Sequence, residues 1–187
     1  VEAPIKETLA AAMVQLSFWK EGRLLVDPCC GSGTIPIEAA LIGRKIAPGL
    51  NRSFASEGWE LIPKRIWKEE RQKAYQEIRY DADLQICGSD TNARAIEAAA
   101  ENAAEAGVDD CIRFQIADVE ELAPGSVTDG IIITNPPYGQ RIGEEASIAR
   151  LYESFRRYMK ENPGWSLFVI TTEKETEERI GREADRR

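Results

Sequence analysis

Short apolar runs that alternate with helix-like stretches most constrain what this chain can fold into. Five runs have the composition of buried strands, at residues 23–27, 84–90, 111–118, 130–134 and 165–171. Ala-rich or amphipathic stretches with helical spacing lie at 4–19, 34–44, 92–107 and 147–159. Strands that alternate with helices predict βαβ units and a parallel sheet. We therefore predict a Rossmann-like α/β fold whose mostly parallel sheet carries helices on both faces.

The length of the chain, 187 residues, fits a single domain with a sizeable core, which we assign to residues 1–187. No apolar run approaches the roughly 20 residues that cross a membrane, and the N-terminal residues lack the pattern of a signal peptide. The chain begins with Val rather than Met. We expect it to be a domain taken from a longer protein.

The four cysteines and the absence of histidine limit the chemistry. Cys29, Cys30, Cys87 and Cys111 form no CxxC pair, so the sequence predicts no zinc site and no other metal. Free thiols favour a reducing compartment, the cytoplasm. Because the chain has no histidine, Ser-His-Asp and Cys-His catalysis is excluded. Any catalysis must use other groups.

Four of the predicted strands end in a polar residue: Asp27, Asp90, Asp118 and Asn135. The carboxyl ends of parallel strands lie along one edge of the sheet, and doubly wound folds bind their ligands beyond that edge. We therefore expect these four residues to meet in one site.

The loop DPCCGSGT follows the first strand and contains Gly31 and Gly33. Glycine allows a tight turn and a close approach of the backbone to a ligand, which favours a nucleoside-binding loop over a plain strand-to-helix turn. The dinucleotide pattern G-x-G-x-x-G is incomplete, because Pro36 stands where the third glycine would be. A Walker A motif is also absent.

Asp90 and Asp118 have the chemistry of nucleoside contacts. A carboxylate at the end of the second strand accepts hydrogen bonds from ribose hydroxyls, and one at the end of the third accepts from an adenine amino group. The alternative for Asp90 is an N-cap of the following helix, which Thr91 or Asn92 could also provide. The alternative for Asp118 is a capping or turn residue.

The stretch NPPYG ends the fourth strand, because two prolines cannot continue a central strand. The amide oxygen of Asn135 and the carbonyl of Pro136 can accept both hydrogens of an exocyclic amino group, and Tyr138 offers a face on which a base can stack. This arrangement stabilises charge without a strong base. The alternative is a rigid loop with packing value only.

These motifs together resemble a known family. DPCCGSGT, the acid at Asp90, AD at Asp118 and NPPYG resemble the S-adenosylmethionine-dependent amino-methyltransferases, and PIKETLAAAM resembles the motif ahead of their first strand. The insertion IAPGLNRSFASEGW resembles the bacterial 23S ribosomal RNA guanine-N2 methyltransferases that carry a THUMP RNA-binding domain. The resemblance implies a Rossmann-like S-adenosylmethionine-dependent methyltransferase fold.

The resemblance implies that six residues contact S-adenosyl-L-methionine: Thr8, Asp27, Gly31, Gly33, Asp90 and Asp118. The first four would face its methionine and ribose side, Asp90 its ribose hydroxyls and Asp118 its adenine. Asn135, Pro136 and Tyr138 would hold the target base, which must leave its stack to reach the site. The implied substrate is guanine N2 of large-subunit ribosomal RNA.

The chain departs from the family pattern in two places. The family sheet has seven strands, so we expect a C-terminal strand pair to be missing here. The N-terminal THUMP domain is also expected to be absent from this chain. The insertion, about residues 44–83, is basic in an acidic chain: Arg44 to Tyr80 carry +4, against −8 overall. We interpret this stretch as an RNA contact, with a structural lid or packing insert as the alternative.

Three other functions stay open at this point. NPPY also occurs in adenine-N6 DNA methyltransferases and in enzymes that methylate a glutamine amide of a protein. A non-catalytic nucleotide-binding module would not require the NPPY arrangement. A nicotinamide-dependent oxidoreductase is disfavoured by the incomplete glycine pattern. The oligomeric state is left open.

Overall fold

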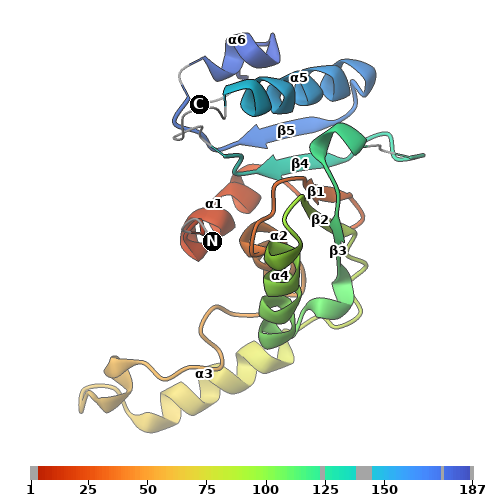
Figure 1. Cartoon of the computed structure of the whole chain (residues 1–187). Helices are drawn as coiled ribbons and strands as arrows, with labels where there is room; N and C mark the ends of the chain where they lie inside the picture. The colour runs from red at the N-terminus through yellow and green to blue at the C-terminus, as the bar shows by residue number, and fades with distance from the viewer. Residues whose placement is uncertain (1–3, 123–124, 138–144, 174, 186–187) are drawn as a thin grey trace.

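The sheet forms the centre of the molecule and is parallel throughout. A computed structural model describes residues 4–122, 125–137, 145–173 and 175–185. Its strands are β1 (Leu25–Asp27), β2 (Ile86–Asp90), β3 (Ile112–Ile116), β4 (Ile131–Thr134) and β5 (Ser166–Val169). They pair in the order β3-β2-β1-β4-β5, and every pairing is parallel. The predicted fold class and the five predicted strands are confirmed in the described residues (Figure 1).

Helices cover both faces of this sheet, as predicted. They are α1 (Glu7–Leu16), α2 (Thr34–Gly43), α3 (Lys64–Gln76), α4 (Ala93–Ala106), α5 (Glu145–Glu161) and α6 (Thr176–Ile180). Three short 3-10 helices add η1 (Ala55–Gly58), η2 (Asp109–Cys111) and η3 (Val119–Glu121). Figure 1 shows α5 and α6 beside β5, while α1, α2 and α4 lie together on the other side of β4.

The alternation of side chains along the strands divides the core into two clusters. Leu25, Ile131 and Ile133 pack with residues of α1, α2 and α4. Val26 and Ile132 point to the opposite face and pack with residues of α5. Because successive residues of a strand face opposite sides, one run of isoleucines fills both clusters. Burial on both faces is what parallel central strands require.

Several predicted element boundaries differ from the structure by a few residues, and two of the differences have a clear physical cause. The first helix is shorter than the predicted range 4–19, because Phe18 has a positive φ of 56° that a right-handed helix cannot contain. The third strand ends at Ile116 rather than Asp118. Asp118 instead caps η3, since its Oδ1 accepts a hydrogen bond from the backbone N–H of Glu120 at 2.9 Å.

The insertion at residues 44–83 forms a projection that we call the arm. It contains η1 and α3 and extends away from the sheet and its covering helices (Figure 1). Two arginines hold its base: Arg44 makes two bonds to the carboxylate of Asp110 at 2.8 and 2.6 Å, and Arg79 bonds Glu21 at 2.7 Å. The two ends of the arm are also joined, because Arg79 N–H donates to the carbonyl of Arg44.

Across the described residues, none of the helices is both long enough and apolar enough to cross a membrane. The cysteines are free thiols, as predicted.

Candidate functional site

The loop between β1 and α2 depends on its two predicted glycines. Gly33 has φ +85° and caps the start of α2, and a Cβ there would lie 3.0 Å from Ala99 Cβ and 3.1 Å from Phe114 Cζ. Gly31 has φ +53°, but a Cβ there would have no neighbour within 4 Å. Gly33 is therefore required by both conformation and packing. Gly31 leaves open space above the loop.

Asp90 connects this loop to the end of β2. Its Oδ2 accepts a hydrogen bond from Gly31 N–H at 3.0 Å, and its Oδ1 accepts one from Asn92 N–H at 2.9 Å. The N-cap of α4 is Asn92, whose side chain accepts from Arg94 N–H at 3.0 Å. The capping role is thus filled by Asn92. Within the described part of the chain these are the bonds that the Asp90 carboxylate accepts, so each oxygen keeps a second lone pair for a ligand.

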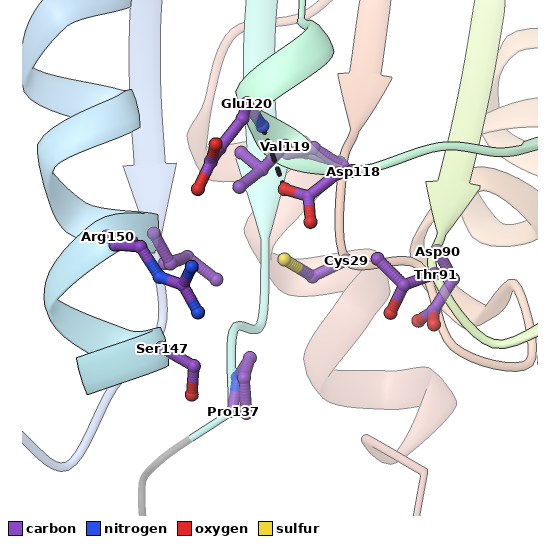
Figure 2. Close-up of a pocket in the computed structure, with 11 residues that line it drawn as sticks. Cys29, Asp90, Thr91, Asp118, Val119, Glu120, Pro137, Ser147 and Arg150 are labelled. Carbon is purple, nitrogen blue, oxygen red and sulfur yellow. Dashed lines mark hydrogen bonds between the residues drawn. The ribbon is translucent and has the colours of Figure 1, made fainter. Parts of the chain in front are cut away.

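A cavity of about 390 Å³ lies beyond the carboxyl edge of the sheet, within the size range of small-molecule sites. Its lining comes from the loops after β1, β2, β3 and β4 and from the first turns of α5: Pro28, Cys29, Asp90, Thr91, Asp118, Val119, Glu120, Pro137, Ser147, Arg150 and Leu151. In Figure 2, Asp118 and Asp90 lie on one side of this space and Arg150 lies opposite. The predicted convergence of strand ends is therefore observed for Asp90 and Asp118.

The fourth strand end reaches the same edge. Asn135 and Pro136 directly follow Thr134, the last residue of β4, and Asn135 is half-buried while Pro136 is buried. The next residue, Pro137, lines the cavity. The loop therefore lies at the side of the cavity formed by β4 and α5. Tyr138 lies outside the described residues.

Asp27 occupies a different place from the other strand-end acids. It is 1% exposed and is not part of the cavity lining. Its Oδ1 accepts hydrogen bonds from the hydroxyl of Thr134 at 2.8 Å and from Cys29 N–H at 3.2 Å. Burial raises its pKa to about 7, against the lowering effect of these two bonds and with a smaller raising effect from Asp90. Asp27 thus joins the end of β1 to the end of β4.

Thr8 is the one predicted site residue that lies ahead of the first strand, in α1. It lies on the exposed side of α1 and is absent from the cavity lining, as are Gly31 and Gly33. The glycines shape the loop that carries Pro28 and Cys29 into the lining. The structure thus brings only part of the predicted set together.

The sequence argument missed the contribution of α5. Its first turns contribute Ser147, Arg150 and Leu151 to the lining. Figure 2 shows Ser147 close to Pro137, and Arg150 on the opposite side of the cavity from Asp118. The amphipathic pattern of 147–159 predicted a helix, but periodicity alone does not say which residue borders a cavity. The one available signal was the position of this helix immediately after the NPPYG segment.

The lining has an acidic character with one cation. Asp90, Asp118 and Glu120 contribute three carboxylates, and Arg150 contributes the one basic side chain among the described lining residues. Cys29 adds a thiol whose pKa is raised far above the usual range, chiefly by burial, so it stays protonated. The cavity therefore suits a ligand with positive charge and hydrogen-bond donors. Among the described residues, no group of His, Cys, Asp and Glu could hold a metal ion.

A parallel five-stranded sheet with a glycine-shaped loop after β1 and acids after β2 and β3 defines a Rossmann-like domain with a ligand site beyond its carboxyl edge. The profile of the RMKL-like methyltransferase domain family matches residues 1–187. The chain belongs to this family, which confirms the resemblance inferred from its motifs.

Two curated relatives extend along nearly the whole chain. YpsC of Bacillus subtilis, provisionally named an RNA methyltransferase, is 45% identical over 99% of this chain and 48% of its own length. Ribosomal RNA large subunit methyltransferase K/L of Shewanella baltica is 39% identical over 99% of this chain and 27% of its own length. The chain therefore spans about half of the first relative and about a quarter of the second.

Two solved structures have the same fold. A Listeria monocytogenes protein named as a predicted N6-adenine-specific DNA methylase superposes with a TM-score of 0.93 at 46% identity, over 100% of this chain and 49% of that one. SMU.472, provisionally named a methyltransferase and solved in complex with SAH, superposes with a TM-score of 0.92 at 38% identity, over 100% of this chain and 49% of that one.

Proposed function

We propose that this domain transfers a methyl group from S-adenosyl-L-methionine to the exocyclic amino group of a base in RNA, guanine N2 of large-subunit ribosomal RNA. The observation that carries the proposal is the meeting of two acids, Asp90 and Asp118, with the Asn135–Pro136 segment at one edge of the sheet. The relative named ribosomal RNA large subunit methyltransferase K/L supports the RNA substrate. The free cysteines support the cytoplasm as its compartment.

The residues of the cavity fit this cofactor. Asp90 can accept from ribose hydroxyls with the lone pairs left by Gly31 and Asn92. Asp118 uses one oxygen on Glu120 N–H and can accept an adenine amino group with the other. The three lining carboxylates favour the positive charge of a sulfonium group. The open space above Gly31 gives the ligand access to the loop backbone.

When bound, S-adenosyl-L-methionine supplies a methyl group on a positively charged sulfur. The amide oxygen of Asn135 and the carbonyl of Pro136 would accept the two amino hydrogens of the target base. These bonds orient the nitrogen lone pair toward the methyl group, so the reaction relies on positioning rather than on a strong base. Tyr138 is the proposed stacking partner of the base.

The buried pair of Asp27 and Thr134 gives this arrangement its rigidity. Thr134 directly precedes Asn135, and its hydroxyl is fixed by the carboxyl at the end of β1. The ends of β1 and β4, which lead into the glycine loop and the Asn135–Pro136 segment, are therefore joined by one hydrogen bond. This contact supports a positioning role for Asp27, and the direct cofactor contact that the resemblance implies stays a prediction.

The first test uses the full-length protein with methyl-labelled S-adenosyl-L-methionine. The acceptors are unmodified ribosomal RNA, duplex DNA and a release-factor protein, and mass spectrometry identifies the labelled product. N2-methylguanosine in the RNA is the expected result. Label confined to DNA or protein would contradict the proposed substrate.

Replacing Asn135 by alanine separates catalysis from cofactor binding. We expect Asn135→Ala to reduce the rate of methyl transfer by about 100-fold or more, in the range of lost transition-state hydrogen bonds. Its affinity for S-adenosylhomocysteine, measured by calorimetry, should stay within a few-fold of wild type. An equal loss of both would assign the loop a structural role only.

Replacing Asp90 by alanine should have the opposite effect. Loss of its ribose contacts and of the bond to Gly31 N–H predicts at least a tenfold weaker affinity for S-adenosylhomocysteine. Asp90→Asn is the matched control, because it keeps the shape and one acceptor oxygen. Unchanged affinity in Asp90→Ala would remove Asp90 from the cofactor site.

A second candidate substrate is adenine N6 in DNA. The Listeria monocytogenes protein whose name carries that activity superposes on the whole chain. Adenine also presents an exocyclic amino group, so the same pair of acceptors would serve it. The DNA acceptor in the labelling experiment distinguishes this candidate from the RNA substrate.

A further inference from the structure

The arm, residues 44–83, has its own small core, built around Phe54. The ring of Phe54 stacks on Trp67 of α3 with centroids 5.8 Å apart and an interplanar angle of 19°. Arg52 and Arg71 place their guanidinium groups 4.8 and 5.9 Å from the Phe54 centroid. These contacts fasten the loop before η1 onto one face of α3.

Arg71 locks this core with hydrogen bonds. Its guanidinium donates to the carbonyls of Leu50 and Arg52 at 2.5 and 2.6 Å and to the carboxylate of Glu57 at 2.6 Å. Glu57 also accepts from Phe54 N–H at 2.9 Å, which closes η1. The arm is therefore a preorganised element rather than a long loop.

The side of α3 next to the one that carries Trp67 and Arg71 is basic and exposed. Lys64, Lys68 and Gln72 lie at i, i+4 and i+8 and so share one side of the helix, with Arg65 beside them. All four are exposed. Neither Lys64, Arg65 nor Lys68 forms an ion pair with another residue in the described ranges, in contrast to Arg71 and Lys73. Three cations of the arm are thus available to an anionic partner.

Large apolar side chains lie directly before this basic face. Trp59 is 63% exposed and Leu61 is 94% exposed, in the segment between η1 and α3. The other tryptophans are covered: Trp19 and Trp165 are buried and Trp67 stacks on Phe54. An exposed indole in the segment that leads into this helix provides a surface on which a base can stack.

We propose that the basic face of α3 and Trp59 form a second contact for the RNA substrate, outside the cavity. This inference rests on the proposed RNA methyltransferase function. It says which surface binds the RNA that flanks the target base. Charge complementarity selects RNA over a protein partner, because α3 carries five basic and two acidic residues in a chain whose net charge is −8. The base of the arm lies at the amino end of the sheet, since Arg44 bonds Asp110 ahead of β3 and Arg79 bonds Glu21 ahead of β1, whereas the cavity lies beyond the carboxyl edge. Only an extended polymer that passes along the domain can therefore contact both.

Trp59 provides the first test. The probe is an unmodified large-subunit ribosomal RNA transcript, titrated into the full-length protein with S-adenosylhomocysteine present. We expect the RNA to quench the fluorescence of Trp59, and Trp59→Phe to abolish that quenching while keeping most of the affinity. Trp59→Ala should weaken binding by about 5- to 150-fold, the range of one lost base-stacking contact. Quenching that persists in Trp59→Phe, together with unchanged affinity in Trp59→Ala, would overturn the proposal.

Charge reversal on the arm provides the second test. The double variant Lys64→Glu and Lys68→Glu removes two cations, so at low salt it should lose more affinity relative to wild type than the control does. The slope of log affinity against log salt should decrease by about 1.4 for two lost contacts to a single strand. The matched control, Lys20→Glu and Lys160→Glu, changes the charge equally at two exposed positions outside the arm. Equal affinity and equal slope in the two double variants would overturn the proposal.

The same variants separate this inference from the proposed function. Methyl transfer to RNA by wild-type protein, with KM and kcat unchanged in the arm variants, would refute the arm contact and leave the function standing. Arm-dependent RNA binding without any methylated RNA would refute the function and leave the contact standing. The expected result is a raised KM with kcat nearly unchanged, because none of the substituted residues lines the cavity.

Discussion

Replacing Thr134 by valine removes one hydroxyl group from a position that is completely buried, with little change of shape. That hydroxyl donates to Asp27 Oδ1 at 2.8 Å, and Asp27 itself is 1% exposed. The backbone N–H of Cys29, at 3.2 Å, is then the remaining donor to this oxygen. A hydrogen bond to a charged group contributes about 1.5–3 kcal/mol, and one to a neutral group about 0.5–1.5 kcal/mol. The cost of Thr134→Val should therefore depend on whether Asp27 is charged.

The pKa of Asp27 sets the direction of that dependence. Its folded-state pKa, about 7, lies above the ordinary value of 3.8 because the group is buried. The folded protein therefore holds a proton that the unfolded chain has released, so the contribution of Asp27 to stability is greatest below about pH 4. That contribution is lost as the pH rises toward 7, at up to about 1.4 kcal/mol per pH unit. Removing the hydroxyl raises the folded-state pKa further and extends this loss above pH 7.

The assay is urea unfolding of wild type, Thr134→Val and Asp27→Asn at pH 5.5 and pH 8.5. We expect Thr134→Val to lower the free energy of unfolding by about 1 kcal/mol at pH 5.5 and by about 2–3 kcal/mol at pH 8.5. Asp27→Asn keeps the shape of the side chain but cannot titrate. The difference in the free energy of unfolding between this variant and wild type should therefore change between pH 5.5 and pH 8.5. If Thr134→Val lowered the free energy of unfolding equally at pH 5.5 and pH 8.5, Asp27 would not be a group that gains its charge near neutral pH.

Two further predictions concern the loop and the arm. Gly33→Ala should destabilise the fold by about 2–3 kcal/mol, since φ is +85° and the new Cβ would meet Ala99 at 3.0 Å, whereas Gly31→Ala should cost only about 1–2 kcal/mol because its surroundings are open. Urea midpoints measure both, and equal losses would contradict the packing argument. Arg71→Ala should loosen the arm and weaken RNA binding while leaving the affinity for S-adenosylhomocysteine unchanged. A calorimetric loss of cofactor affinity in Arg71→Ala would mean that the arm also supports the cavity.

The sequence by itself determined the sheet, because its physical rules are local. Apolar runs of four to five residues that end in Asp or in Asn-Pro can form short buried strands, and the two prolines fix the end of β4 at Thr134. Helices between such strands force them to run parallel, so Asp90 and the Asn135 segment had to reach the same edge. The sequence also predicted the turn of the first loop from its glycines, because a left-handed backbone such as that of Gly33 favours glycine.

Only the tertiary structure decided how those residues divide their tasks. Asp27 and Asp90 look alike in the sequence, yet neighbouring strands bury Asp27 against Thr134 and leave Asp90 at the cavity. Asp118 lies two residues past its strand because its own side chain caps η3. Arg150 enters the site from α5, and no local pattern specifies which side of a helix borders a cavity. Burial and long-range contact depend on how the elements pack together, which no short segment of the chain encodes by itself.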